Sequence, residues 1–253
     1  MSPAEFTRRR WVTDGAMATH LFSKGAAHPV EALNLTNPGL VTTVHREYLD
    51  AGAQILRTNS FGGTLGAKQA SLDIARKAAQ DRALVAGVIG STGADGTREW
   101  FRDCALALHG VDLYILETFT SLAELSIAVA AVREVSDQTL IAQVSVEQDG
   151  TLRDGSQPEA YGHALDALAA DVIGFNCCFG PESIASAFDR VRAATTRPMS
   201  ACPNLSTENI AAYARRFLDS GALVVGACCG STPEHIRAIA YEHATLDSQW
   251  PRT

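Results

Sequence analysis

Short apolar runs alternate with longer stretches of helical periodicity along the whole chain. Apolar and β-branched runs, several bounded by polar or glycine residues, predict strands at residues 11–13, 54–58, 84–89, 111–116, 140–146, 171–175, 198–202 and 222–225. Stretches with apolar residues three and four positions apart predict helices at residues 40–51, 65–82, 97–108, 121–135, 158–169, 182–194, 207–218 and 233–246. Strand and helix therefore alternate from one end of the chain to the other.

Eight such units in 253 residues predict an α/β fold, a (β/α)8 TIM barrel, which has about this length. The alternative is a doubly wound open sheet, which usually carries a glycine-rich phosphate turn after its first strand. The first turn here reads Asp14-Gly15-Ala16-Met17 and lacks that pattern. Because no linker or low-complexity stretch divides the chain, we expect one domain over residues 1–253.

The composition limits the classes of protein to which the chain can belong. Hydrophobic residues make up 46% of the chain and the formal net charge is -7, which excludes disorder. Because the chain is mildly acidic, its net charge does not favour binding to the negatively charged backbone of a nucleic acid. Neither a signal peptide nor an apolar run long enough for a membrane helix is apparent. We therefore expect a cytoplasmic protein that binds no nucleic acid or membrane.

The chemistry of a barrel lies at the carboxyl ends of its strands. Those ends are polar here, and the last three of them hold five of the six cysteines: Cys177, Cys178, Cys202, Cys228 and Cys229. In a cytosolic chain, such clustering indicates metal binding or catalysis more than disulfides. Three thiolates from two neighbouring strand ends suit Zn²⁺, and three protein ligands leave the open fourth position of a catalytic site.

Several segments carry a resemblance to a known family. They read TDGAMAT (13–19), YLDAGA (48–53), RTNSFG (57–62), LETF (116–119), GFNC (174–177) and GACCGSTPEHI (226–236). With them the chain resembles the homocysteine S-methyltransferase family, from about the first strand to the last helix. The family includes betaine–homocysteine methyltransferase and the homocysteine-binding module of cobalamin-dependent methionine synthase.

The resemblance implies a set of site residues. Cys177, Cys228 and Cys229 would bind zinc, and Asp14, Gly15 and Glu117 would help to hold the amino acid part of homocysteine. Asn59 and Ser60 lie on the same rim and are expected to shape the pocket. The two additional rim thiols, Cys178 and Cys202, are expected to pack against neighbouring helices. The alternative is that Cys202 faces the zinc and competes for its open position, or forms a disulfide under oxidation.

The predicted reaction follows from thiol chemistry. A free thiol has a pKa near ~8.5, and a bound metal removes its proton. The resulting homocysteine thiolate would attack an activated methyl group and give methionine. The donor would be a small sulfonium, a betaine, or a methylated corrinoid carried by a separate protein. Two alternatives remain, namely a different thiol or selenol acceptor, and a zinc-binding subunit without turnover.

The chain departs from the family in three places. Its loops after Gly63 and after Leu205 are short, and Ala227 stands where a second glycine usually precedes the paired cysteines. Because rim loops carry the specificity of a barrel, we expect a more open pocket on the side of the methyl donor.

Overall fold

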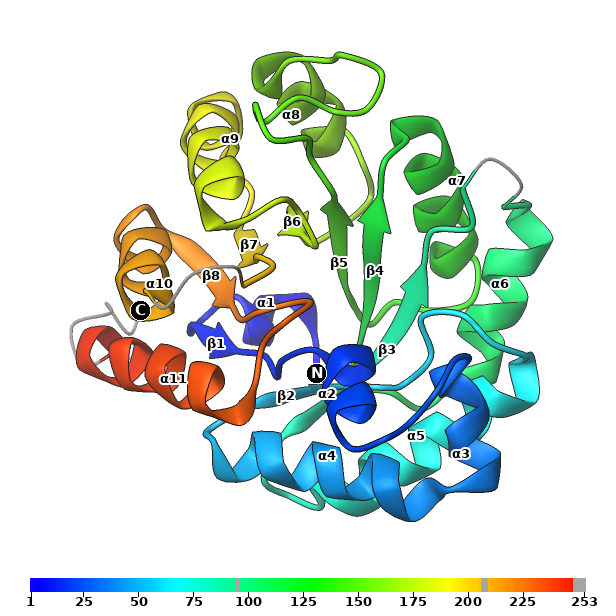
Figure 1. Ribbon diagram of the computed structural model, residues 1–253. Helices are drawn as coiled ribbons and strands as arrows, with labels where there is room; N and C mark the ends of the chain where they lie inside the picture. Colours follow the sequence, from blue (N-terminus) through cyan, green and yellow to red (C-terminus); the bar gives the residue numbers. More distant parts are fainter. Residues whose placement is uncertain (94–95, 206–208, 248–253) are drawn as a thin grey trace.

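The computed structural model describes residues 1–93, 96–205 and 209–247, and in this part of the chain eight parallel strands form a barrel (Figure 1). The strands are β1 (Trp11–Val12), β2 (Ile55–Arg57), β3 (Leu84–Gly90), β4 (Leu113–Phe119), β5 (Thr139–Val144), β6 (Val172–Asn176), β7 (Met199–Cys202) and β8 (Ala222–Val225). Each strand from β2 to β8 pairs with the next, and β8 pairs with β1. The ring closes through a bridge between Thr13 and Ile55. The predicted TIM barrel is confirmed.

The main helices surround the strands on the outside (Figure 1). Thr64, Thr97 and Ser121 cap three of them by accepting a hydrogen bond from a backbone N–H of the first turn. The start of the predicted helix at 207–218 lies partly outside the described residues. The observed helices are α4 (Pro38–Asp50), α5 (Leu65–Ala79), α6 (Arg98–Ala107), α7 (Leu122–Arg133), α8 (Pro158–Asp166), α9 (Pro181–Ala194), α10 (Ile210–Asp219) and α11 (Pro233–Asp247).

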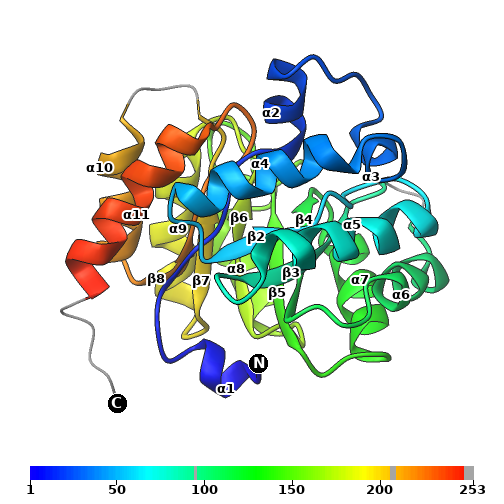
Figure 2. The same cartoon turned by 90° about the horizontal axis from the view of Figure 1, so that it is seen from below.

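Short helical segments that the periodicity did not indicate cover the two ends of the barrel. Figure 2 shows α2 (Met17–Ser23) at one end and α1 (Pro3–Phe6) at the other. The 3-10 helix η1 (Val30–Ala32) and α3 (Leu33–Thr36) follow α2 within the connection from β1 to α4. The connection from β1 to α4 therefore contains three additional short helical segments. Some of its residues line the site described below.

Apolar side chains fill the barrel and the space between strands and helices. The inner core includes Ile55, Ile115 and Ile141. It also contains Phe6 and Trp11, whose stacked rings have centroids 5.1 Å apart. The strands are buried on both faces, as expected for a parallel sheet covered by helices. Within the described residues, no helix is long and apolar enough to cross a membrane.

Candidate active site

Three cysteines meet at the carboxyl ends of β6 and β8. Cys177 directly follows β6, and Cys228 and Cys229 follow β8 after two residues. Their three sulfur atoms lie within 4.8 Å of one another, and the sulfurs of Cys177 and Cys229 are 3.6 Å apart. Among the described residues, this is the one group of three side chains that could hold a metal ion. The structure therefore brings together all three residues expected to be ligands.

The end of β7 fixes the spacing between the two cysteine loops. This strand lies between β6 and β8. Its terminal Cys202 accepts a hydrogen bond from the N–H of Cys177 at 3.2 Å through its carbonyl, and the carbonyl of Pro203 accepts one from Cys228 at 2.7 Å. Cys177 also has a φ of 51°, a left-handed conformation that turns the chain sharply after β6. Backbone contacts thus hold the two cysteine loops beside the end of β7.

The cluster readily carries negative charge on one sulfur. Hydrogen bonds from the thiols of Cys177 and Cys228 lower the pKa of Cys229. The hydrogen bonds of Cys177 with Cys228 and Cys229 raise the pKa of Cys177 itself. One thiolate stabilised by two thiol donors is a suitable starting point for a soft divalent cation, which binds the deprotonated form.

The other two rim cysteines are buried outside this cluster. The sulfur of Cys178 accepts a hydrogen bond from the N–H of Val146 at 3.2 Å. The sulfur of Cys202 lies 3.8 Å from both Thr13 Oγ1 and Gln143 Nε2. Burial raises the pKa of Cys178 to about 12 and that of Cys202 to about 11. These polar contacts are to β5 and to the residues that follow β1 and β5, whereas the sequence predicted packing against neighbouring helices.

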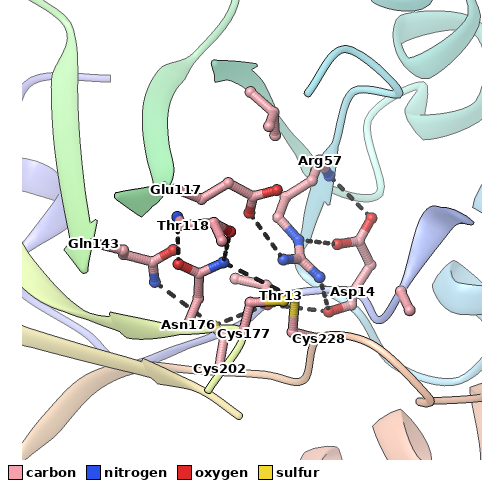
Figure 3. Close-up of polar contacts among 12 residues, drawn as sticks. Thr13, Asp14, Arg57, Glu117, Thr118, Gln143, Asn176, Cys177, Cys202 and Cys228 are labelled. Atoms are coloured by element: carbon pink, nitrogen blue, oxygen red, sulfur yellow. Dashed lines mark hydrogen bonds and ion pairs between the residues drawn. The ribbon is translucent and has the colours of Figure 1, made fainter. Parts of the chain in front are cut away.

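Asn176, the last residue of β6, forms two side-chain hydrogen bonds with Thr118 near the end of β4 (Figure 3). Its Oδ1 accepts a hydrogen bond from the N–H of Thr118 at 2.7 Å, and its Nδ2 donates to Thr118 Oγ1 at 2.8 Å. Thr118 has a φ of 64°, and the register of β4 against β5 shifts between Leu116 and Phe119. The prediction had ended this strand at 116, whereas it continues through this irregularity to Phe119.

A buried arginine that the sequence analysis did not single out lies between the two expected substrate carboxylates. Arg57, the last residue of β2, donates from Nε to Asp14 Oδ1 at 2.7 Å and from Nη1 to Glu117 Oε2 at 3.2 Å (Figure 3). Its Nη2 donates to three backbone carbonyls, those of Asp14, Gly15 and Ala227. One guanidinium therefore ties together loops that follow β1 and β8 and the end of β4.

A signal for Arg57 was present in the sequence. It is the one charged residue in the apolar run that predicts β2, at 54–58. A cation in a buried strand needs anionic partners, and the sequence predicts Asp14 and Glu117 on the same rim. Burial raises the pKa of Glu117 to about 7, and the positive charge of Arg57 opposes that rise.

The remaining expected site residues form the wall next to β2. Asn59 Nδ2 donates to the carbonyl of Val30 at 2.9 Å and to Asn34 Oδ1 at 3.0 Å. Ser60 Oγ donates to the carbonyl of Val88 at 2.8 Å. Both side chains are therefore engaged in holding the wall. Gly15 is needed for close packing, because a Cβ there would lie 2.6 Å from Ser231 Oγ.

A cavity of about 330 Å³ opens onto the three cysteines. Its lining includes Arg57, Glu117 and the sulfur cluster, together with residues of α2 and η1. Of the eight expected site residues, Asp14 does not line this cavity. The lining includes Gly15, Asn59, Ser60, Glu117, Cys177, Cys228 and Cys229.

The chain matches a known protein family. The family model described as homocysteine S-methyltransferase matches residues 11–242, which is nearly the whole barrel. The chain belongs to the homocysteine S-methyltransferase family. The resemblance inferred from the sequence motifs is thereby confirmed.

Individual relatives agree with this assignment. Methionine synthase of Mycobacterium tuberculosis is 29% identical over 298 aligned positions, which cover 95% of this chain and 25% of that protein. The chain thus spans about a quarter of the length of this relative. The homocysteine methyltransferase MmuM of Escherichia coli in its apo form has a TM-score of 0.80 and 26% identity, with 92% of this chain and 95% of that chain covered. A metallated form of MmuM matches with the same TM-score and coverage of 92% and 96%, at 25% identity.

Proposed function

We propose that this chain is a zinc-dependent S-methyltransferase that transfers a methyl group to the thiol of homocysteine and forms methionine. The observation that carries the proposal is the cluster of Cys177, Cys228 and Cys229 opening onto a cavity that Glu117 also lines. The names of the methionine synthases and of MmuM support homocysteine as the acceptor. The free thiols of all six cysteines support a reducing compartment such as the cytoplasm.

Zinc fits the donor set better than a hard cation. Three sulfurs and no carboxylate oxygen form the group, and thiolates select zinc over magnesium or calcium. When bound, zinc would supply the Lewis acidity that keeps the acceptor sulfur deprotonated near neutral pH. Three protein ligands leave room for that sulfur in a tetrahedral site.

The residues of the chain would bind and orient the acceptor. Glu117 lies in the cavity wall beside the cysteines and carries the charge that attracts the ammonium group of homocysteine. Gly15, Asn59 and Ser60 line the cavity in which the carbon chain would lie, together with Met17, Ala18 and Thr19 of α2. Cys177, Cys228 and Cys229 would hold the ion that keeps the acceptor thiol deprotonated, and the cavity would hold the methyl donor in line with that sulfur, so that the bond from the methyl group to the departing donor breaks as the new S–C bond forms.

The methyl donor belongs to one of two classes. A sulfonium or betaine is small enough for the cavity, whereas a methylated corrinoid on a separate protein would have to dock over the rim. Methionine formation from homocysteine, measured with each donor class in turn, separates them. Turnover with a free small-molecule donor at full rate would contradict the corrinoid donor.

The first experiment is the zinc content of the purified, reduced protein. We expect one zinc per chain in the native protein and in Cys178→Ala, and loss of zinc in Cys228→Ser. Cys178 is the matched control because it is a buried thiol next to the cluster but outside it. A folded, reduced native protein that refuses added zinc would contradict the proposed mechanism.

A further inference from the structure

The peptide unit between Ala227 and Cys228 is held at both of its polar ends. Its carbonyl oxygen, on Ala227, accepts a hydrogen bond from Arg57 Nη2 at 2.8 Å. Its N–H, on Cys228, donates to the carbonyl of Pro203 at 2.7 Å. Because a peptide unit is planar, these two hydrogen bonds together fix the plane from which the chain enters Cys228.

The guanidinium of Arg57 is itself held in one orientation (Figure 3). Asp14 accepts from Nε through Oδ1 at 2.7 Å and from the backbone N–H of Arg57 through Oδ2 at 2.9 Å. Glu117 Oε2 accepts from Nη1 at 3.2 Å. A guanidinium is planar and rigid, so two held nitrogens determine where the third, Nη2, lies. The two carboxylates therefore direct Nη2 toward the carbonyl of Ala227.

The same nitrogen links the loop after β8 to the loop after β1. Nη2 also donates to the carbonyls of Asp14 and Gly15, at 3.0 and 2.9 Å. The two loops touch, since a Cβ on Gly226 would lie 1.9 Å from Thr13 Oγ1. Arg57 thus bonds both loops at the point where they meet, immediately before the paired cysteines.

We propose that Arg57 is a positioning residue of the metal centre, which holds the loop of Cys228 and Cys229 in the conformation that binds zinc. The inference rests on the proposed function, in which the bound ion is zinc. Replacing a group that orients metal ligands from outside typically lowers metal affinity by about 10–100-fold. Arg57 acts in this way through the backbone of Ala227, not through a sulfur atom.

The test measures zinc affinity by competition with a chromophoric chelator, for the reduced native protein and its variants. Arg57→Gln removes the guanidinium, and we expect zinc affinity to fall by about 10–100-fold. Arg57→Lys keeps the positive charge, but an ammonium group does not reproduce the planar fork. We therefore expect a loss in the same range, which separates positioning from charge alone.

Arg133→Gln is the matched control. Arg133 likewise donates to backbone carbonyls, those of Ala169 and Gln138, and to one carboxylate, that of Asp171. These contacts lie next to the starts of β5 and β6, at the end of the barrel opposite to the cysteines. Both substitutions should lower the stability of the metal-free protein in urea, but Arg133→Gln should keep zinc affinity within about twofold of native. Zinc affinity of folded Arg57→Gln within that range would overturn the inference.

A second variant covers the case in which Arg57→Gln does not fold. The single substitution leaves the buried carboxylate of Asp14 without its partner, which is strongly destabilising. Asp14→Asn combined with Arg57→Gln removes both charges of this pair and still lacks Nη2, so the same loss of zinc affinity is expected. Should neither protein fold, a crystal structure of the native protein with zinc decides. Arg57 Nη2 within about 3.2 Å of the Ala227 carbonyl supports the inference, and a guanidinium turned away from it overturns the inference.

Zinc binding also separates this inference from the proposed activity, because it requires neither homocysteine nor a methyl donor. Weakened zinc binding in Arg57→Gln, together with a native protein that transfers no methyl group, would support the inference and overturn the activity. Methyl transfer by the native protein, together with native zinc affinity in folded Arg57→Gln, would support the activity and overturn the inference.

Discussion

Thr118 adopts a backbone conformation that β-branched residues avoid. Its φ is 64°, a region that costs of order 1–3 kcal/mol for such a residue unless its surroundings impose it. Asn176 imposes it by bonding both the N–H and the hydroxyl of Thr118. Since Glu117 is the preceding residue, the strained conformation fixes the carboxylate that faces the cavity.

Removing these contacts should cost more in lost hydrogen bonds than it returns in relieved strain. We expect Asn176→Ala to lower the free energy of unfolding by about 2 kcal/mol, because it removes the two hydrogen bonds that Asn176 forms with Thr118. In a Thr118→Gly background the cost should be smaller by about 1 kcal/mol, because glycine lacks the hydroxyl to which Asn176 Nδ2 donates. Urea denaturation of the four proteins measures this coupling. An equal cost in both backgrounds would show that Asn176 does not act through Thr118.

The clustering of the cysteines could be predicted from the sequence, whereas the contacts of Arg57 could not. Thiols gathered at the ends of the last three strands have few structural explanations, so their pattern alone indicated a metal site. The motif that contains Arg57 was recognised, but its contacts depend on where the carbonyls of Gly15 and Ala227 lie in space. Such contacts arise from loop conformations, which neither periodicity nor spacing specifies.

At the scale of elements, β6 and β7 approach each other closely at Gly174. A Cβ on this residue would lie 2.1 Å from the carbonyl oxygen of Ser200 in β7. The glycine thus allows β6 to run beside β7 up to Cys177, which the carbonyl of Cys202 then holds. Strand packing and cysteine placement depend on the same close approach.

Gly174→Ala should therefore destabilise the barrel. We expect a loss of about 3 kcal/mol of unfolding free energy, because the new methyl group would contact a strand backbone that cannot move aside easily. Gly66→Ala is the control, since a Cβ at Gly66, in α5, meets nothing within 4 Å and alanine favours helix. Thermal denaturation and zinc content of both variants test this. Equal stability of the two variants would contradict the close approach.

The elements that periodicity missed are the short ones. The strands and main helices follow from patterns that extend over several residues, and the predicted and observed bounds differ by only a few residues. The segments α2, η1 and α3 contain three to seven residues each, too few to establish a helical repeat. Residues of α2 and η1 line the cavity, so the part of the site with the weakest sequence pattern is the part least predictable from sequence.

At the scale of the molecule, closure of the barrel determines which residues meet. Cys177 and Cys229 are 52 positions apart along the chain, yet their sulfurs lie 3.6 Å apart because β7 holds the ends of β6 and β8 side by side. The order of the strands could be predicted from the alternation of strand and helix, and with it the gathering of the cysteines. A ligand bound by all three thiols therefore links the end of β8 to the end of β6 across β7, and acts on the stability of the whole fold.

Zinc should accordingly stabilise the folded protein. Three ligands in this geometry exist only when β6, β7 and β8 are assembled, so zinc binds the folded state in preference to the unfolded chain. With free zinc at about 1,000 times its dissociation constant, the expected gain is about 4 kcal/mol, or roughly 10 °C in Tm for a chain of this size. Thermal denaturation in a zinc buffer and in excess chelator measures the difference. Cys178→Ala should keep the response, whereas Cys228→Ser should lose most of it. An undiminished response in Cys228→Ser would mean that zinc stabilises the fold from a different site.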